Sequence, residues 1–258
     1  MFDFNKHLNT IVQGDSLLLL QDIPNETADL VVCDPPYGIN YKEWDKIDNF
    51  LEFCESWIKE CFRILKPNGS FYSFMGWSNV AEFKLLLDKY GYIKNWIVWE
   101  RNKGRGSTTN YKSVKEELLY YIKSKNDYVF NEQKMLKKHV IPYVKDGKPR
   151  GWYTDENGIR CRWTGIGNVW HYTPPFFKMK ECVGHPSQKP ELMIERIILS
   201  SSNENDMVLD PFSGSGTVAV VCQRLGRKFL CIEKDEEYYR KSVGRLNKEI
   251  QENKSKFF

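Results

Sequence analysis

The pattern of apolar and polar positions alternates between short apolar runs and longer amphipathic stretches. Apolar runs at Thr10–Gln13 and Ala28–Cys33 predict two strands, and GDSLLLLQDI between them predicts a turn and a helix. The stretch NFLEFCESWIKECFRILKPNG predicts a helix closed by its proline and final glycine. Its apolar residues recur at helical spacing, at Phe50, Cys54, Trp57, Cys61 and Ile64.

The alternation continues with a predicted strand at SFYSF and a predicted helix at NVAEFKLLLDKYG, which has a glycine at its end. Another strand is predicted at YIKNWIVWE. It resumes near the end of the chain. A helix is predicted for HPSQKPELMIERIILSSS, with Pro190 near its first turn. After it we expect a strand at MVLD, a helix at TVAVVCQRLG, a strand at KFLCIE and a charged helix from Asp235. Such alternation predicts an α/β fold with a mainly parallel sheet.

Between these two parts the pattern breaks. RNKGRGSTTNYKS is a basic loop rich in Gly, Ser and Thr, ELLYYIKS predicts a strand, and roughly fifty residues up to Lys180 follow without a regular period. We interpret this stretch as an insertion. We therefore expect a catalytic half over residues 1–125, an insert over 126–182 and a cofactor-binding half over 183–258 that completes the same domain.

Composition narrows the class of protein. The 258 residues are 41% hydrophobic, enough for a substantial core. No apolar run reaches the ~18 residues of a membrane span, and the first ten residues lack the apolar segment of a signal peptide. The seven cysteines stand at irregular spacing without a CxxC pair, which favours reduced thiols and a cytoplasmic location.

Charge is unevenly distributed, although the net charge is only +4. Residues 101–180 hold 17 of the 38 Lys and Arg but 7 of the 34 Asp and Glu. This basic excess and its accompanying aromatic residues suit a polyanion with stackable bases, so nucleic acid is the favoured partner. Alternatively, the charged residues form an ordinary solvated surface, and the aromatic residues form a small apolar core packed on the sheet. The aromatic residues are Trp152, Tyr153, Trp163, Trp170 and Tyr172.

A glycine-rich segment, DPFSGSGT, lies between a predicted strand and a predicted helix, where backbone N–H groups can approach a ligand. It lacks the GK[ST] of a phosphate loop and the GxGxxG of a dinucleotide fold. Glu233, at the end of the next strand, can accept both hydroxyls of a ribose. A nucleoside cofactor without a pyrophosphate, such as S-adenosylmethionine, suits this combination.

The segment Asp34-Pro35-Pro36-Tyr37 follows the second predicted strand, at the edge where open α/β sheets bind ligands. The prolines remove two N–H donors and stiffen the turn. The Asp34 carboxylate and the Pro35 carbonyl are two acceptors beside one aromatic ring, a set that matches the exocyclic amino group of a nucleobase. A base in a duplex reaches such a pocket only by rotating out of the stack, at a cost of roughly a few kcal/mol.

DPPY together with the FxGxG loop of Phe212, Gly214 and Gly216 resembles the amino-group DNA methyltransferases, which transfer a methyl group from S-adenosylmethionine to adenine N6 or cytosine N4. The order of DPPY, basic insert and glycine loop resembles their circularly permuted β group, and within it the small modification enzymes of the MboII type. GDS, HPSQKP and CIEKD extend the resemblance over nearly the whole chain. It implies a Rossmann-like methyltransferase fold with a mixed, mostly parallel sheet, one antiparallel strand and helices on both faces.

The resemblance also implies site residues. Asp34, Pro35, Pro36 and Tyr37 would form the catalytic site. Asp15 would receive the adenine amino group of the cofactor, and Glu233 its ribose hydroxyls. Its methionine carboxylate would lie near the charge of Lys189 and accept from His185, Ser187, Ser215 and Thr217. The full implied cofactor set is Asp15, Ser16, Asp34, His185, Ser187, Lys189, Asp210, Pro211, Phe212, Gly214, Ser215, Gly216, Thr217 and Glu233.

Double-stranded DNA is the implied substrate, and the insert is the expected target-recognition region. The loop over residues 101–113 is expected to close over DNA. The resemblance leaves open a homodimer and a cognate restriction endonuclease that acts separately, as in restriction-modification systems. The basic residues expected to contact DNA are Arg101, Lys103, Arg105, Arg160, Arg162 and Lys178.

Adenine N6 is favoured over cytosine N4 because Asp at the first position of this motif is commonest in the adenine enzymes of the family. An RNA methyltransferase, and a DNA-binding module that keeps the fold without activity, are the alternatives. Protein glutamine methylation generally goes with Asn-Pro-Pro-Tyr, which Asp34 disfavours. No metal is expected, because the spacing of Cys161, His171, Cys182 and His185 matches no structural zinc pattern.

Overall fold

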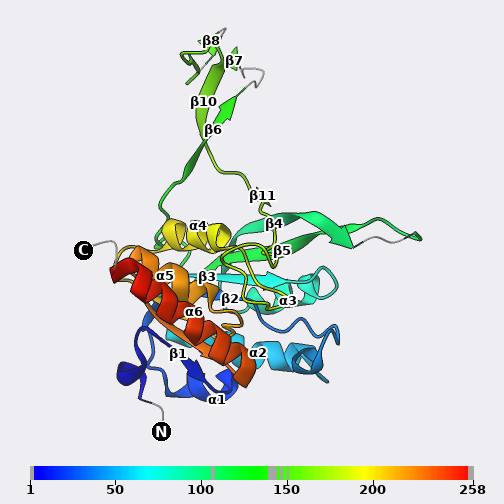
Figure 1. Ribbon diagram of the computed structural model, residues 1–258, viewed down its shortest axis with the longest axis vertical. Coiled ribbons are helices and arrows are strands. Elements are labelled where there is room, and N and C mark those ends of the chain that lie inside the picture. The colour runs from blue at the N-terminus through cyan, green and yellow to red at the C-terminus, as the bar shows by residue number, and fades with distance from the viewer. Residues whose placement is uncertain (1–2, 106–107, 139–143, 146–147, 150, 255–258) are drawn as a thin grey trace.

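The apolar runs of the chain become the strands of one large sheet (Figure 1). The computed structural model describes residues 3–105, 108–138, 144–145, 148–149 and 151–254. Within these residues the main sheet has eight strands. In spatial order they are β1 (Thr10–Gln13), β13 (Lys228–Glu233), β12 (Met207–Asp210), β2 (Ala28–Cys33), β3 (Leu65–Met75), β5 (Ser113–Ile122), β4 (Tyr92–Arg105) and β11 (Val169–His171).

Strand direction in this sheet is mixed but mostly parallel. Strands β1, β13, β12, β2 and β3 pair in parallel, as do β4 and β11. Strand β5 is antiparallel to both of its neighbours, β3 and β4. The predicted mixed sheet with one antiparallel strand is therefore confirmed. Because the parallel strands end at one edge, the loops that follow them open on the same side of the molecule.

Helices cover both faces of the sheet. One core cluster packs α2 and α3 against the face that carries Val31 and Cys33 of β2, and the other packs α4, α5 and α6 against the face of Leu30 and Val32. Burial on both faces explains why β2 is apolar at four successive positions, Leu30 to Cys33. The helices are α1 (Ser16–Leu19), α2 (Phe50–Ile64), α3 (Val80–Leu87), α4 (Glu191–Ser201), α5 (Thr217–Leu225) and α6 (Glu236–Lys254), with short 3₁₀ helices at Phe4–His7, Leu20–Asp22 and Glu43–Asp45.

Helix α2 forms as its spacing predicts. The Asn49 side chain caps it by accepting the Glu52 N–H, and its apolar face is buried. The following strand differs from the prediction, because β3 begins at Leu65 and contains Pro67 and Gly69. The pairing of β2 with β3 is irregular there, since its register shifts between Ala28 and Leu30. Such an irregularity accommodates a proline that cannot donate to the ladder.

The segment 101–113, expected as a loop, is partly a hairpin. Strand β4 continues to Arg105, which pairs with Ser113 at the start of β5. The two strands extend beyond the rest of the sheet as a long arm (Figure 1). Ser113, Val114 and Lys115 are exposed, so neither face of the arm is buried there and the sequence lacks the alternation that reveals a strand.

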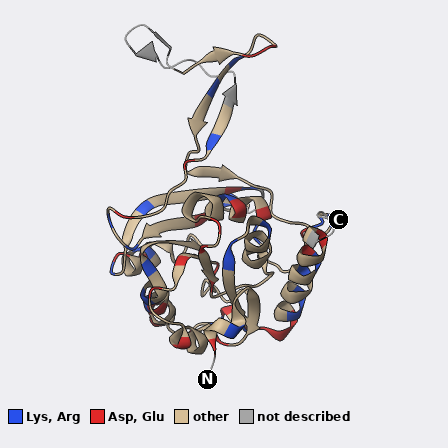
Figure 2. Cartoon of the chain, turned by 90° about the vertical axis from the view of Figure 1, so that its left-hand side faces the viewer, with Lys and Arg blue, Asp and Glu red and all other residues tan. Residues whose placement is uncertain are grey.

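The predicted insert contains a separate antiparallel sheet that projects from the main body (Figure 1). Figure 2 shows Lys and Arg along its strands. Strand β11, although within residues 126–182, joins the main sheet beside β4. The strands of the projecting region are β6 (Lys134–Lys138), β9 (Tyr153–Thr154) and β10 (Arg160–Gly165), with a two-stranded ribbon of β7 (Val144–Lys145) and β8 (Lys148–Pro149). None of the helices in the described residues combines the length and apolar composition of a membrane span.

Candidate active site

A cavity of about 1100 Å³ lies at the edge where β1, β13, β12, β2 and β3 end. The antiparallel β5 contributes its first residues to the same wall. The fold thus gathers residues from both ends of the chain around one space. The predicted site residues that line it are Asp15, Ser16, Asp34, Pro35, Pro36, Tyr37, His185, Ser187, Lys189, Asp210, Pro211, Phe212, Gly214, Ser215, Thr217 and Glu233.

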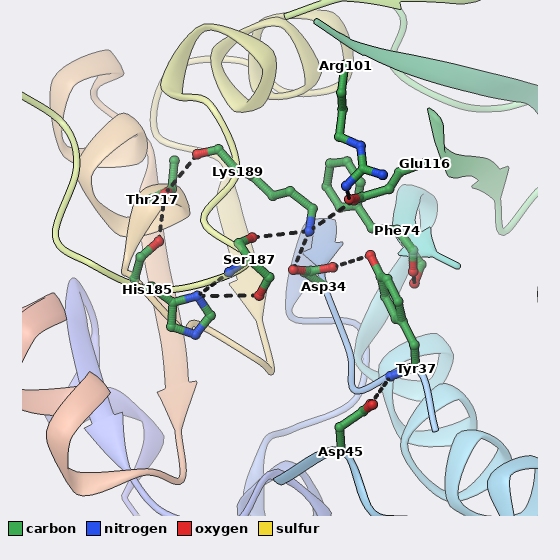
Figure 3. A network of polar contacts seen from close by, with 12 residues as sticks. Asp34, Tyr37, Asp45, Phe74, Arg101, Glu116, His185, Ser187, Lys189 and Thr217 are labelled. Carbon is green, nitrogen blue, oxygen red and sulfur yellow. Dashed lines mark hydrogen bonds and ion pairs between the residues drawn. The ribbon is translucent and has the colours of Figure 1, made fainter. Parts of the chain in front are cut away.

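Asp34 follows β2 directly, and both of its carboxylate oxygens have partners (Figure 3). One oxygen accepts the Tyr37 hydroxyl at 2.7 Å, and the other lies 2.5 Å from the Lys189 ammonium. Burial, followed by the charge of Asp34, raises the pKa of Tyr37 well above its ordinary value. The phenol therefore stays protonated and acts as a donor to Asp34.

Lys189 belongs to a chain of alternating charges. Its ammonium also lies 3.4 Å from Glu116, which accepts from Arg101 at 2.8 Å. Burial alone would lower the pKa of Lys189, but the carboxylates of Asp34 and Glu116 raise it above its ordinary value. Lys189 is therefore a buried cation, held between two acids from different strands.

Two of the predicted site residues, Lys189 and Arg101, have partners inside the cavity. The Lys189 ammonium, predicted near the cofactor carboxylate, pairs with Asp34 and donates to the Ser187 carbonyl at 3.3 Å (Figure 3). The guanidinium of Arg101 lies in the cavity wall and pairs with Glu116, and its contact with DNA stays a prediction. Sequence reasoning missed Glu116, since nothing local marks it as facing Lys189.

Aromatic rings surround the Lys189 ammonium. It lies 4.9 Å from the ring centre of Phe74 and 5.8 Å from that of Tyr37. Gly76 follows β3 beside the Tyr37 ring, where an added Cβ would lie 3.1 Å from Cδ2 of Tyr37. A residue without a side chain at position 76 therefore lets the backbone approach the ring.

Asp45 holds the loop that follows DPPY, and it too was missed. The residue is 1% exposed, and its carboxylate accepts four backbone N–H groups: those of Tyr37 at 2.6 Å, Gly38 at 2.9 Å, Ile39 at 3.1 Å and Tyr41 at 2.9 Å. Four donors on one buried carboxylate fix the course of the backbone. Asp45 therefore positions the Tyr37 ring.

At the opposite end of the cavity, Glu233 ends β13. One of its oxygens accepts the Gly214 N–H at 2.6 Å and the other accepts the Asp235 N–H at 2.8 Å. Burial raises the pKa of Glu233, partly offset by these two backbone hydrogen bonds. The carboxylate is thus fixed with lone pairs available beside the glycine loop.

The two loops beside Glu233 are linked to each other. Asp15 caps α1 by accepting the Leu17 N–H at 3.0 Å, and its other oxygen pairs with Lys234 at 2.8 Å. The Ser16 hydroxyl donates to the Pro211 carbonyl, which joins the loop after β1 to the loop after β12. Sequence reasoning did not find Lys234.

The glycine loop has two glycines in the left-handed region, Gly214 at φ +49° and Gly216 at φ +73°. At Gly214 an added Cβ would lie 3.1 Å from Nε2 of His185, in the cavity. At Gly216 it would lie 2.8 Å from Cβ of Ser242 on α6, and Gly216 is absent from the described cavity wall. Gly216 therefore allows α5 and α6 to pack closely, and its role at the cofactor stays a prediction.

Asp210, at the end of β12, accepts the Phe212 N–H at 3.0 Å. Its pKa lies well above the ordinary aspartate value, because the side chain is buried and because Asp34 and Glu233 add negative charge. The Phe212 ring packs edge-on against Trp57, with ring centres 5.2 Å apart. Both residues therefore shape the loop between the two ends of the cavity.

Four side chains were expected to donate to a carboxylate. His185 packs edge-on against Tyr238, and burial, followed by the charge of Lys189, lowers its pKa to about 4. Ser187 lies 3.4 Å from Nδ1 of His185. The hydroxyls of Ser215 and Thr217 lie 3.0 Å apart.

A buried arginine of α6, Arg245, holds Ser215 and Thr217 in place. The sequence did not predict its role. Arg245 of α6 donates to the Thr217 hydroxyl and to the Ser215 carbonyl, each at 3.0 Å, and pairs with Glu191 at 2.6 Å. Its side chain is buried, so the cation has given up water for these partners. Arg245 therefore ties the end of the glycine loop to α4 and α6.

This wall fits S-adenosylmethionine. The carboxylates of Asp15 and Glu233 are acceptors after β1 and at the end of β13, the two strands on one side of β12 and its glycine loop, and the carboxylate of Asp34 suits a cationic sulfonium. The missing side chain at Gly214 leaves space beside His185 for a ligand. Asp15, Glu233 and the loop Phe212–Ser215 would hold the cofactor.

Arg160, Arg162 and Lys178 lie outside the described wall of the cavity. Arg160 and Arg162 lie on β10 of the projecting sheet, and Lys178 lies on an exposed loop with its ammonium 5.6 Å from the Phe177 ring centre. The side chains of Lys103 and Arg105 fall outside the described residues. The aromatic residues of the insert differ in burial: Trp170 is buried in the core, whereas Trp163 is exposed.

Comparison with known proteins identifies the family. A family model described as N6_N4_Mtase, DNA methylase, matches residues 28–244. The chain is 36% identical to the DNA adenine methyltransferase YhdJ of Escherichia coli K12, over 95% of this chain and 84% of the relative. It is 34% identical to the type II methyltransferase M1.MboII of Moraxella bovis, over 93% and 97%.

Solved structures agree with these relatives. The M1.HpyAVI–SAM complex is 25% identical and superposes with a TM-score of 0.66, over 92% of this chain and 98% of the other. The cytosine-N4-specific PvuII DNA methyltransferase shares the fold at 20% identity, with a TM-score of 0.67, over 92% and 85%. The resemblance indicated by DPPY and the glycine loop is thereby confirmed: this chain belongs to the N6/N4 family of DNA methylases, enzymes that use S-adenosylmethionine.

Proposed function

We propose that this chain methylates the N6 amino group of an adenine rotated out of double-stranded DNA at a specific sequence. The observation that carries the proposal is the Asp34–Tyr37 turn in the cavity, with a carboxylate, a carbonyl and an aromatic ring around one space. Adenine is favoured over cytosine by the Asp at position 34 and by the name of the relative YhdJ.

The residues of the turn would act together on the target amine. Its lone pair is delocalised into the ring, which makes it a poor nucleophile. Hydrogen bonds from its two N–H groups to Asp34 and to the Pro35 carbonyl would draw the nitrogen toward sp³ geometry. A carboxylate has about four lone-pair sites, so Asp34 can keep Tyr37 and Lys189 as partners while it accepts from the base. Tyr37 would stack on the base plane.

S-adenosylmethionine supplies an activated methyl group when it is bound. The main contribution of the chain would be to hold the cofactor and the target base in a fixed relative position. Glu233 and Asp34, at the two ends of the cavity, both lie where strands end at the same sheet edge. Well-oriented reactants gain up to about 7–11 kcal/mol over free ones. No covalent intermediate with the enzyme is needed for this displacement.

DNA would be held by parts of the chain outside the cavity. We assign target recognition to the insert, residues 126–182, whose projecting sheet carries Arg160 and Arg162. The catalytic half, residues 1–125, contributes the β4–β5 arm. The cofactor-binding half is residues 183–258. A homodimer, a separately acting restriction endonuclease and a cytoplasmic location complete the proposed setting of a restriction-modification enzyme.

The test is incubation with tritiated-methyl S-adenosylmethionine and unmethylated genomic DNA, followed by nucleoside chromatography and single-molecule sequencing. Label in N6-methyladenosine at one sequence motif is the expected result, and the Asp34→Asn variant, in which label should accumulate far more slowly, serves as the control. Label in N4-methylcytosine would overturn the choice of base. An absence of label in DNA, with the cofactor demonstrably bound, would overturn the proposed substrate and direct the search to RNA.

A further inference from the structure

Trp77 lies on the rim of the cavity, two residues after the end of β3, and its side chain is 70% exposed. Tryptophan is the largest apolar side chain and is on average highly buried in folded proteins. The ring contacts found among the described residues do not include Trp77. An indole left in water beside a substrate pocket is free to contact a bound substrate.

The backbone of Trp77 is fixed to the backbone of Tyr37. The side-chain amide of Asn79 donates to the Tyr37 carbonyl at 2.7 Å, and the Asn79 N–H donates to the Gly76 carbonyl at 3.3 Å. Gly76 itself abuts the Tyr37 ring. The turn over residues 76–79 therefore moves with Tyr37, so Trp77 is presented at a constant position relative to the pocket.

Other exposed aromatic residues at the rim are engaged with each other. Tyr41 packs edge-on against Trp44, with ring centres 6.4 Å apart, and Trp44 stacks over His185 at 6.5 Å. Inside the pocket, Tyr37 and Phe74 surround the Lys189 ammonium. Trp77 thus differs from the rings inside by its exposure and from the rings at the rim by its lack of a stacking neighbour among the described residues.

We propose that Trp77 enters the DNA duplex and fills the gap that the extruded base leaves. This inference rests on the proposed function. Rotating a base into the pocket opens a hole in the stack, and an apolar side chain inserted there replaces the lost contacts. The high exposure of Trp77 favours the duplex over the pocket interior as its binding partner, because a ring that covered the base would lie beside Tyr37, within the cavity.

The experiment uses the recognition duplex defined by sequencing, in two forms: one with the target adenine and one with an abasic site in its place. Wild type, Trp77→Ala, Trp77→Phe and Tyr92→Ala are compared by fluorescence anisotropy with bound cofactor. Tyr92 is an exposed aromatic residue at the start of β4, outside the described wall of the cavity, and so controls for loss of an exposed ring.

We expect Trp77→Ala to bind both duplexes about tenfold more weakly, because one aromatic stacking contact is lost. Trp77→Phe should recover most of the affinity, and Tyr92→Ala should bind as the wild type does. Isothermal titration of S-adenosylmethionine should be the same for all four proteins, which shows that the variants are folded.

Weaker binding of Trp77→Ala to the adenine duplex alone would mean that the ring stacks on the extruded base, and would overturn the proposal. Unchanged binding to both duplexes would also overturn it. These outcomes are separate from failure of the proposed function, in which the wild type transfers no methyl group to any DNA. In that case both proposals fall together.

Discussion

Asp34 and Lys189 form a largely buried ion pair, 2.5 Å long, although 155 positions separate them in the sequence. Removing one partner of such a pair leaves a charge without compensation, at a cost of about 3–5 kcal/mol. We expect Asp34→Asn to lower the free energy of unfolding by about 3 kcal/mol, toward the lower end because Glu116 still faces Lys189. Denaturation in urea measures the loss.

The double variant Asp34→Asn with Lys189→Gln provides the control for that prediction. It removes both charges, so it should recover part of the lost stability while remaining inactive. Equal stability of the wild type and Asp34→Asn would contradict the ion pair. In activity, Asp34→Asn should lose about 10²–10³-fold in kcat, the scale seen when one electrostatic contact to a reacting group is removed.

Mutation should distinguish the contribution of the Tyr37 ring to kcat from that of its hydroxyl. Tyr37→Phe keeps the stacking surface and loses only the 2.7 Å hydrogen bond to Asp34, so we expect a small change in kcat. Tyr37→Ala loses the ring, and base stacking on an aromatic residue contributes about 1–3 kcal/mol. Steady-state kinetics with a defined duplex distinguish them. An inactive Tyr37→Phe would assign the main role to the hydroxyl instead.

Asp45→Asn should reduce kcat without changing cofactor affinity. The amide of Asn keeps one acceptor oxygen but turns an NH₂ toward backbone donors, so the loop that carries Tyr37 shifts. Misplacement of a reacting group by about 1 Å costs on the order of 10²-fold in rate. Asp48→Asn, an exposed acid on the same segment, is the matched control. Equal kcat for the two variants would argue against a positioning role.

His185 should titrate with a pKa of about 4, as burial and Lys189 disfavour its protonated form. Its ordinary value is about 6.5, so the unfolded chain binds the proton first as the pH falls. The contribution of neutral His185 to the free energy of unfolding is therefore fully present above about pH 6.5 and is lost as the pH falls toward 4. NMR of the imidazole measures the pKa, and His185→Gln should flatten this part of the stability curve. A midpoint near 6.5 would contradict the burial.

Glu233→Gln should weaken S-adenosylmethionine binding by about 10- to 100-fold, the loss typical of a hydrogen bond to a charged group. Its amide would also face the Gly214 N–H, which the carboxylate accepts at 2.6 Å. Calorimetric titration gives the Kd, with the exposed Glu237→Gln as control. Wild-type affinity should fall on acidification because burial raises the pKa of Glu233, and the variant should lack this fall.

The sequence predicts the central elements well because burial leaves a clear local record. Strand β2 is apolar at successive positions since both of its faces are covered, and α2 carries its apolar stripe at helical spacing. The motifs at the ends of β2 and β12 could be placed at one edge because parallel strands end together. Local patterns thus suffice for the parts of the site that follow directly from a buried strand.

Other features depend on contacts that no local pattern encodes. Glu116 faces Lys189 only because β5 runs antiparallel and brings its first residues to the catalytic edge. Arg245 reaches the glycine loop from another helix. In the insert, β10 has exposed residues on both faces, so it shows neither an apolar run nor an alternation.

The strand order of the main sheet has a consequence for synthesis of the protein. Strands β1 and β2 are made first, but β13 and β12 lie between them. Until residues 207–233 leave the ribosome, the first two strands have no partner on their facing edges. Sheets that join distant segments fold slowly, and their unpaired edges are prone to aggregate. The first strands of the sheet therefore leave the ribosome well before the segments that complete the reaction centre, which cannot assemble until residues 207–233 have been synthesised.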